Sequence, residues 1–424
     1  MEGIPFAKPY IGKEEEEAVL AVLRSGWLTT GRETLEFEND FENFLKTNSG
    51  IKDPIYCMAV NSATSGLHLA LEAIGVNKGD IVLIPSLTFT STAEVVRYLG
   101  AEIVFVDVLK DSYHMDPAAL EKTLERLEKG LGPYPARDGQ NRDGLDPAGF
   151  GPRGKAKAVI PVHYGGLPCD MAAIAPIAEK YGLKIVEDAA HSFPSIVPEV
   201  PGLNKAGSKT FAGLLGNIGV FSFYATKTIT TGEGGMVVTR DKKIADRIKI
   251  MRSHGIDRTV FNRYTDTKAS WYYEVVEPGF KYNIPDVLSA LGRAQLRRAM
   301  ELLDMRKEIA RLYNEAFAGE TSLTIPENGP GHAYHLYPLR LNLEKLQISR
   351  NVFAEKMQEE GVGISVHFIP LHTMPYYRDL YSLKEEDFPE TMKTFLRTIT
   401  IPIWPGMSKE QINRVIAVVK NLAS

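Results

Sequence analysis

The sequence is poor in the features that mark exported, membrane-bound and disulfide-bonded proteins. Its 424 residues include only two cysteines, Cys57 and Cys169, which lie far apart and in neither a C-x-x-C nor a metal-ligand spacing. We interpret both as core thiols of a protein from a reducing compartment. No run approaches the ~18 apolar residues of a membrane span, and the N-terminal MEGIPFAKPYIGKEEEE has no apolar signal-peptide core. We therefore expect a cytoplasmic protein with no membrane partner.

Basic runs are also absent. The 49 basic and 53 acidic residues give a formal net charge of -4 and are interspersed, so no segment is suited to tracking a phosphodiester backbone. Nucleic acid is therefore not an expected partner. What the chain does have is a hydrophobic fraction of 44% with 24% charged residues, enough to bury a large core and to divide into a larger and a smaller domain.

Between residues 55 and 240, short apolar runs rich in β-formers alternate with longer segments of helical spacing. Such alternation predicts an α/β fold in which a mainly parallel sheet is covered by helices. Helices are expected at Gly66–Gly75 and Met171–Tyr181. Seven strands are expected at Ile55–Val60, Ile81–Pro85, Ile103–Val106, Ala158–Val162, Lys184–Glu187, Gly219–Phe223 and Met236–Thr239.

After Asp286 the pattern becomes strongly helical through Phe317. Strand-like alternation then follows at His335–Leu341, and an amphipathic helix is expected at Lys409–Leu422. We therefore expect a large domain at 1–285, which includes the N-terminal segment, and a linking helix with a small α+β domain at 286–424. Residues 130–154 are rich in Gly, Pro, Asp and Arg, which predicts a long surface loop.

The run Glu187-Asp188-Ala189-Ala190-His191 directly follows a predicted strand. Ligands of open α/β sheets bind beyond the carboxyl ends of the strands, where these side chains would lie. Asp188 could hold a cationic ring nitrogen there, and His191 could lie over the face of the same ring. An aspartate that only caps the next helix would show the same pattern.

A second run, Phe221-Ser222-Phe223-Tyr224-Ala225-Thr226-Lys227, ends on a lysine that is surrounded by aromatic residues and glycines. Partial desolvation favours the neutral amine that forms a Schiff base, although a single lysine of this kind is usually a solvated loop residue. The hydroxyl and amide of Ser222 suit a phosphate dianion.

Two further segments follow earlier strands. Small residues at Asn61–Gly66 open a helix, where backbone amides can approach an anion, although an ordinary capped helix looks the same. Phe89 follows the next strand and could stack on a flat ring or belong to the core. The order of phosphate loop, aromatic, aspartate, serine and lysine on successive strand ends favours one shared site.

These motifs resemble those of the DegT-type nucleotide-sugar aminotransferases, which are pyridoxal 5′-phosphate (PLP) enzymes of the aspartate aminotransferase fold (fold type I). The similarity extends over nearly the whole chain. It is carried by the segments SGWLTTG at 25–31, SATSG at 62–66, PSLTF at 85–89, IPVHYGG at 160–166, EDAAH at 187–191, FSFYATK at 221–227, TGEGG at 231–235, KYN at 281–283 and HFIPLH at 367–372.

The resemblance implies a role for each catalytic residue. Lys227 would form the Schiff base with PLP and move protons, Asp188 would pair with the ring nitrogen, and His191 and Phe89 would flank the ring. The phosphate would be bound by Thr64, Ser65 and Ser222 of one chain and by Asn283 of a second chain. A site completed by two chains implies a homodimer.

The implied reaction transfers an amino group from L-glutamate to a nucleotide-linked keto-sugar and releases 2-oxoglutarate, as in cell-envelope polysaccharide or lipopolysaccharide synthesis. The signatures are most similar to the branch that makes UDP-4-amino-4-deoxy-L-arabinose, so a UDP-4-keto-sugar is the first candidate. The segments 130–154 and 192–218 differ from that branch as insertions, and HFIPLH differs in sequence. Substrate contacts are expected from Trp27, Thr29, Arg263, Tyr264, His367 and His372.

Several alternatives stay open at this point. A 3-amino-sugar aminotransferase or a PLP-dependent sugar dehydratase would use the same scaffold, although the dehydratases commonly lack the lysine or carry cluster-binding cysteines. A non-catalytic sensor would not need Lys227, Asp188 and Ser222 together. No G-x-G-x-x-G follows the first strand, which disfavours a dinucleotide-binding protein. No metal site is expected, and His332 and His335 are interpreted as structural residues on a strand.

Overall fold

The computed structural model describes residues 3–134, 154–198, 200, 209–257 and 272–423. Its main element is a seven-stranded sheet of order β1-β9-β8-β5-β4-β2-β3, in which only β9 runs antiparallel to its neighbours. The predicted fold class, a mainly parallel sheet with helices around it, is therefore confirmed. The seven strands are β1 (Tyr56–Val60), β2 (Ile81–Pro85), β3 (Glu102–Val106), β4 (Ala156–Val159), β5 (Lys184–Asp188), β8 (Ile218–Ser222) and β9 (Gly235–Thr239).

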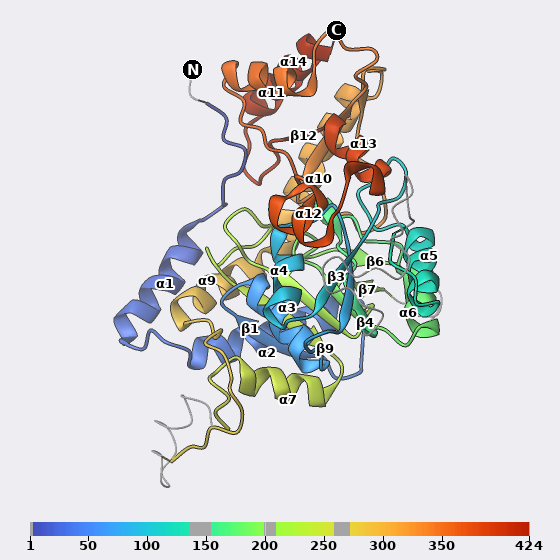
Figure 1. Ribbon diagram of the computed structural model, residues 1–424. Helices are drawn as coiled ribbons and strands as arrows, with labels where there is room; N and C mark the ends of the chain where they lie inside the picture. The colour runs from blue at the N-terminus through green and yellow to red at the C-terminus, as the bar shows by residue number, and fades with distance from the viewer. Residues whose placement is uncertain (1–2, 135–153, 199, 201–208, 258–271, 424) are drawn as a thin grey trace.

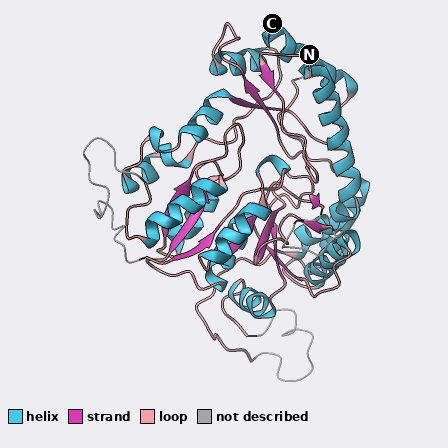
Figure 2. Ribbon diagram, turned by 90° about the vertical axis from the view of Figure 1, so that its right-hand side faces the viewer, coloured by secondary structure: helices cyan, strands magenta, loops and turns pink. Residues whose placement is uncertain are grey.

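Helices cover both faces of this sheet (Figures 1 and 2). Alternate residues of one strand point to opposite faces, so Met58 and Val60 of β1 join one core while Cys57 and Ala59 join another. Helices α3, α4 and α7 pack on the first face, and α2, α5, α6 and α9 on the second. The helices are α1 (Lys13–Ser25), α2 (Arg32–Ser49), α3 (Ala63–Ala73), α4 (Thr90–Tyr98), α5 (Pro117–Glu128), α6 (Met171–Lys180), α7 (Lys242–Met251) and α9 (Asp286–Arg297).

The C-terminal part forms a second, smaller core around a three-stranded antiparallel sheet of order β10-β11-β12. The described chain begins and ends at this end of the molecule, beside α11 and α14 (Figure 1). The elements are α10 (Ala299–Phe317), β10 (Leu323–Thr324), β11 (Tyr337–Leu341), α11 (Arg350–Glu359), α12 (Pro375–Tyr381), α13 (Pro389–Arg397), β12 (Thr398–Ile401) and α14 (Lys409–Ala423). No described helix has the length and apolar character needed to cross a membrane.

The two cores exchange short segments. Ile4 of the N-terminal segment belongs to the small core, where its amide donates to the Gly361 carbonyl at 2.8 Å. Conversely, Leu371, Tyr377 and Phe388 pack in the core of the large sheet. The division at 285/286 therefore stays a prediction, since the packing crosses it in both directions.

The insertion at 192–218 contains a small two-stranded antiparallel sheet, β6 (Ile196–Val197) with β7 (Thr210–Phe211). The predicted surface loop at 130–154 lies outside the described residues apart from its first five and its last.

Candidate active site

A cavity of about 410 Å³ lies at the carboxyl ends of the central strands. This is where an open α/β sheet is expected to bind its ligand, and the volume is in the range of small-molecule sites. Seven of the fourteen predicted site residues line it together although they are far apart in sequence. They are Thr64, Phe89, Asp188, His191, Ser222, Lys227 and His367, joined by Ser62, Tyr224, Glu233, His335 and Phe368.

Asp188 is the last residue of β5 and is buried. The Thr92 hydroxyl donates to its Oδ2 at 2.8 Å, and the Ala190 amide donates to its Oδ1 at 3.2 Å. Burial raises the pKa of this carboxyl, while the two hydrogen bonds oppose the shift. The two hydrogen bonds thus hold the carboxylate in place at the cavity wall. Because it is desolvated, a cationic partner would stabilise its charged form.

Lys227 follows β8 and is likewise desolvated. Burial lowers the pKa of its amine to about 7, against a smaller opposing effect of Asp188. An amine with this pKa is largely neutral slightly above pH 7, the state required of a nucleophile or a base. Its Nζ lies 3.3 Å from His335 Nε2.

The predicted ring-flanking residues lie on the cavity wall. His191 is buried and accepts a hydrogen bond on Nδ1 from the Gly165 amide at 3.2 Å. Burial, with Lys227 and His367 adding to it, holds the pKa of His191 well below its usual value, so its ring is neutral. Phe89 is 53% exposed, and its ring centroid lies 5.8 Å from that of Phe368. A half-exposed aromatic beside a cavity has a free face for stacking.

Hydroxyl groups and a helix start form another part of the wall. Ser62 is the N-cap of α3, and its Oγ accepts from the Ser65 amide at 3.1 Å. Thr64 lies in the first turn and lines the cavity together with Ser222. Ser65 is buried beside them, with its hydroxyl donating to Asn61 Oδ1 at 2.7 Å and not lining the cavity. The positive end of α3 and these hydroxyls suit an anion.

His335 was interpreted from the sequence as a structural strand residue, and the structure corrects that interpretation. It precedes β11, which starts at Tyr337, and its ring lines the cavity at hydrogen-bonding distance from Lys227. His332 does not line the cavity; its Nδ1 accepts from the Tyr334 amide at 2.9 Å. The motif H-x-x-H could not distinguish the two, because the contact joins segments 108 residues apart.

Four predicted residues lie away from this cavity. Trp27 lines a different cleft with Arg293, and Thr29 is exposed on the turn before α2. His372 is buried, bonded through Nδ1 to the Ser86 hydroxyl and packed on Phe388. Asn283 follows the KY dipeptide, and its Nδ2 donates to the Thr30 hydroxyl. Arg263 and Tyr264 lie outside the described residues.

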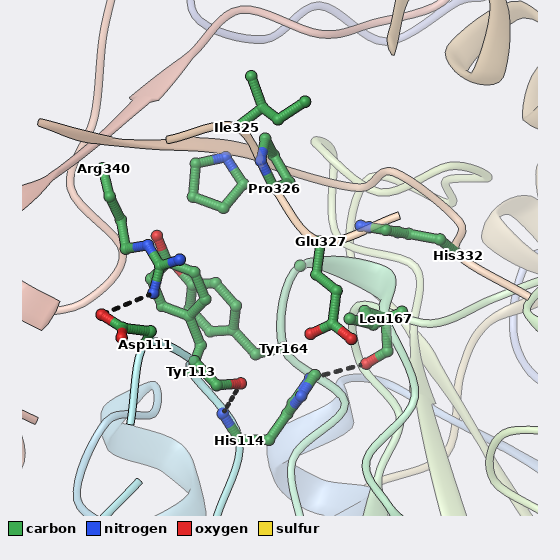
Figure 3. Close-up of a pocket in the computed structure, with 13 residues that line it drawn as sticks. Asp111, Tyr113, His114, Tyr164, Leu167, Ile325, Pro326, Glu327, His332 and Arg340 are labelled. Atoms are coloured by element: carbon green, nitrogen blue, oxygen red, sulfur yellow. Dashed lines mark hydrogen bonds and ion pairs between the residues drawn. The ribbon is translucent and has the colours of Figure 1, made fainter. Parts of the chain in front are cut away.

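A smaller pocket lies beyond Tyr164 (Figure 3). The Tyr164 ring stacks on that of Tyr113 with centroids 4.4 Å apart. Its centroid also lies 6.2 Å from the ring centroids of two cavity residues, His191 and Phe368. His114 Nε2 is bonded to the Leu167 carbonyl at 2.9 Å. Tyr164 therefore supports the active-site wall from behind.

Comparison with known proteins agrees with the geometry. Two relatives are each 38% identical to this chain. One is the uncharacterized protein MJ1066 of Methanocaldococcus jannaschii, over 423 residues (99% of this chain and 98% of the relative). The other is the spore coat polysaccharide biosynthesis protein SpsC of Bacillus subtilis, over 422 residues (99% and 97%).

Among solved structures, the putative sugar aminotransferase Spr1654 of Streptococcus pneumoniae matches in its PMP form with a TM-score of 0.81, 27% identity and 99% of both chains covered. Its PLP form matches with a TM-score of 0.80 and 26% identity, covering 99% of this chain and 98% of that one. The predicted enzyme class, an aminotransferase, and the predicted cofactor, PLP, are confirmed. A family model matches residues 9–420, and the chain belongs to the DegT/DnrJ/EryC1/StrS aminotransferase family.

Proposed function

We propose that this enzyme transfers an amino group from L-glutamate to a nucleotide-linked keto-sugar, with a UDP-4-keto-sugar as first candidate, and releases 2-oxoglutarate and an amino-sugar nucleotide. The observation that carries the proposal is the pair of buried Asp188 and half-buried Lys227, which face one cavity of about 410 Å³ with the start of α3 in its wall. The names of two similar proteins support a sugar substrate: SpsC is a spore coat polysaccharide biosynthesis protein, and Spr1654 is a putative sugar aminotransferase.

The residues present fit the cofactor. Asp188 offers a buried carboxylate to the pyridinium N–H, and Thr64 and Ser222 offer hydroxyls beside a helix N-terminus to the phosphate. Lys227 would hold the aldehyde end, and His191 and Phe89 would lie against the ring.

When bound, PLP supplies the electron sink for the negative charge that develops at the substrate carbon. The protein supplies position and proton transfer. Lys227 Nζ, neutral because of its burial, accepts the proton from the Cα of glutamate and returns a proton in the sugar half of the reaction. Asp188 holds its negative charge where it favours a protonated ring nitrogen. Phe89 and Phe368 lie next to each other in the cavity wall, with their ring centroids 5.8 Å apart.

We further propose that the enzyme is a cytoplasmic homodimer that works in cell-envelope polysaccharide or lipopolysaccharide synthesis. The second chain would supply Asn283 to the phosphate, since this side chain does not line the cavity of its own chain. Trp27, Thr29, Arg263, Tyr264, His367 and His372 stay candidates for sugar-nucleotide contact. Among them His367 lines the cavity, and burial lowers the pKa of its imidazole to about 4.

An absorbance spectrum of the purified protein before and after glutamate tests the first half of the reaction. We expect the long-wavelength band of lysine-bound cofactor to give way to the shorter-wavelength band of the amine form. Incubation of that amine form with a panel of UDP- and dTDP-linked 3-keto and 4-keto sugars then tests the acceptor, and mass spectrometry identifies the product. Loss of a hydroxyl in place of amination would overturn the transaminase in favour of a dehydratase; no spectral change with glutamate would refute the donor.

A further inference from the structure

Lys227 contacts His335, and none of the sequence motifs predicts this contact. The two side chains come from opposite sides of the domain junction, yet Nζ and Nε2 lie 3.3 Å apart. His335 is buried, and its ring packs on that of His191 with centroids 4.5 Å apart. The imidazole is therefore held in place by packing and offers one ring nitrogen to the lysine.

The other ring nitrogen indicates the tautomer. His335 Nδ1 is buried and has no hydrogen-bond partner among the described residues. A buried N–H donor without an acceptor is rarer and more costly than an unpaired acceptor lone pair. The proton therefore belongs on Nε2, where it is donated to the lone pair of a neutral Lys227 amine. Burial is the main cause that keeps the pKa of His335 well below its usual value, in agreement with a neutral ring.

A buried arginine fixes the backbones on both sides of this contact. Arg306 of α10 donates through Nη1 to the carbonyls of His335 at 3.2 Å and Ile403 at 2.7 Å, and through Nη2 to the carbonyl of Thr226 at 3.3 Å. Thr226 immediately precedes Lys227, so one guanidinium bonds to the main chain beside each partner. The separation between Nζ and Nε2 is thus set by main-chain anchors and does not depend on the long lysine side chain alone.

We propose that His335 is a positioning residue that donates a hydrogen bond from Nε2 to Lys227 Nζ, keeping this amine neutral and aimed into the cavity, with Arg306 as the clamp that sets their separation. The inference deepens the proposed function, because it rests on Lys227 as the reacting amine. It assigns to residues of the linking helix and the small domain a part in preparing the lysine.

The expected sign follows from the groups that face Lys227. A donated hydrogen bond stabilises the neutral amine only, so its loss raises the pKa of Lys227, by about half to one unit for an ordinary neutral hydrogen bond. The remaining charged and titratable neighbours stay in place in such a variant: Asp188, His191, Arg306 and His367.

Competitive labelling of the cofactor-free full-length protein with trace acetic anhydride tests this directly. The reagent acetylates neutral amines, so the pH dependence of labelling at the Lys227 peptide, measured by mass spectrometry, reports its pKa; exposed Lys122 serves as internal reference. We expect His335→Gln, whose amide can still donate to Nζ, to follow the wild type, and His335→Leu to titrate about half to one unit higher. An unchanged or lower value in a folded His335→Leu variant would overturn the proposal.

A measurement on the unaltered protein keeps the proposal testable if His335→Leu does not fold. Nitrogen-15 labelling of histidine reports which ring nitrogen carries the proton, and the signal that disappears in His335→Gln is that of His335. A proton on Nε2 is expected, and a proton on Nδ1 would refute the assignment. Both experiments use cofactor-free protein, so a failed reaction with glutamate would contradict the proposed function and leave this result intact.

Discussion

Burial acts in opposite directions on the two ionisable groups of the cavity. It raises the pKa of the Asp188 carboxyl and lowers that of the Lys227 amine. Burial therefore destabilises the charged form of each group. A cationic ligand group would stabilise the Asp188 carboxylate, and the neutral Lys227 amine is the form that reacts with an aldehyde. A pair of this kind in one cavity is more typical of a catalytic site than of a structural ion pair.

Replacement of Asp188 by Asn should slow the enzyme without unfolding it. The amide keeps the shape and can still accept from the Ala190 N–H and bond to the Thr92 hydroxyl, but it has no charge to hold the ring nitrogen protonated. We expect turnover to fall by about 10²–10³-fold, the size of a lost electrostatic contact in a buried site. Steady-state kinetics and circular dichroism measure both effects. Asp170→Asn, at the exposed N-cap of α6, is the control, and an unaffected rate in Asp188→Asn would refute the role.

The lowered pKa of Lys227 predicts a pH-dependent stability in the cofactor-free protein. Between pH 7 and about 10, the unfolded lysine is protonated while the folded one is neutral, so the unfolded state binds more protons. Its contribution to the free energy of unfolding therefore rises with pH, by about 1.4 kcal/mol per unit. Urea unfolding of the wild type and of Lys227→Met at pH 7.5, 8.5 and 9.5 isolates this effect. A difference between the two proteins that does not change with pH would mean that Lys227 is charged when folded.

At the residue scale, the sequence predicts the site residues that lie at the ends of strands, but not those that come from distant parts of the chain. Asp188, Ser222 and Lys227 could be placed because each stands at or near the end of a recognisable strand. His335 could not, because its position depends on how the C-terminal part of the chain packs on the large sheet. His372 shows the same limit, because its motif did not indicate the hydrogen bond that its ring makes with Ser86.

At the element scale, six of the seven predicted strands agree with the structure to within one residue at each end, because buried parallel strands are continuous apolar runs. The exception is the strand expected at Ala158–Val162, which is found at Ala156–Val159. Pro161 has no amide hydrogen to donate, so the regular ladder is interrupted there, and only an isolated bridge between Val162 and Asp188 follows it. The apolar pattern continues beyond Pro161, and for this reason the predicted strand was too long at its C-terminal end.

Two glycines in the sheet allow close backbone contacts that the apolar pattern of the sequence does not indicate. A Cβ on Gly219 of β8 would lie 2.0 Å from the Gly213 carbonyl oxygen, and one on Gly235 of β9 would lie 2.9 Å from the Ala63 amide nitrogen. The missing side chain of Gly235 therefore lets the start of α3 approach the sheet, and that of Gly219 lets the backbone at Gly213 approach β8. The approach at Gly235 brings the N-terminal end of α3, the proposed phosphate site, next to Ser222, which pairs with Gly235 across the sheet.

The start of α2 depends on one carboxylate from another helix. Asp286 Oδ1, at the start of α9, accepts from the Gly31 amide at 2.7 Å, the Thr34 amide at 3.0 Å and the Thr34 hydroxyl at 2.8 Å. We expect Asp286→Ala to lower the free energy of unfolding by about 3 kcal/mol, because several buried donors lose their acceptor. Urea denaturation measures it. Asp241→Ala, which removes the exposed cap of α7, should cost only about 1 kcal/mol, and equal losses would contradict the proposed buried cap.

At the scale of the whole molecule, sequence predicted two units and the order of their elements, but not their interlocking. Ile4 in the small core and Tyr377 in the large one are each separated from their neighbours by hundreds of residues, and an apolar side chain does not indicate which core it enters. Nor does an exposed apolar side chain indicate whether it contacts a second copy of the chain. Leu20 and Leu23 on α1 and Leu28 beyond it are each more than 40% exposed, which is a suitable surface for a second copy of the chain.

Shared active sites can be tested by mixing two inactive variants. If Asn283 completes the cavity of its partner, a heterodimer of Lys227→Ala and Asn283→Ala chains has one site with both residues intact. Random reassembly makes half of the dimers mixed, so about a quarter of wild-type activity should return in a protein of twice the 47.0 kDa chain mass. The matched control is Lys227→Ala mixed with Asp188→Asn. These two residues line the same cavity of one chain, so no mixed dimer regains an intact site. Recovery in the first mixture alone would establish that two chains build each site, whereas recovery in neither would place Asn283 with its own chain.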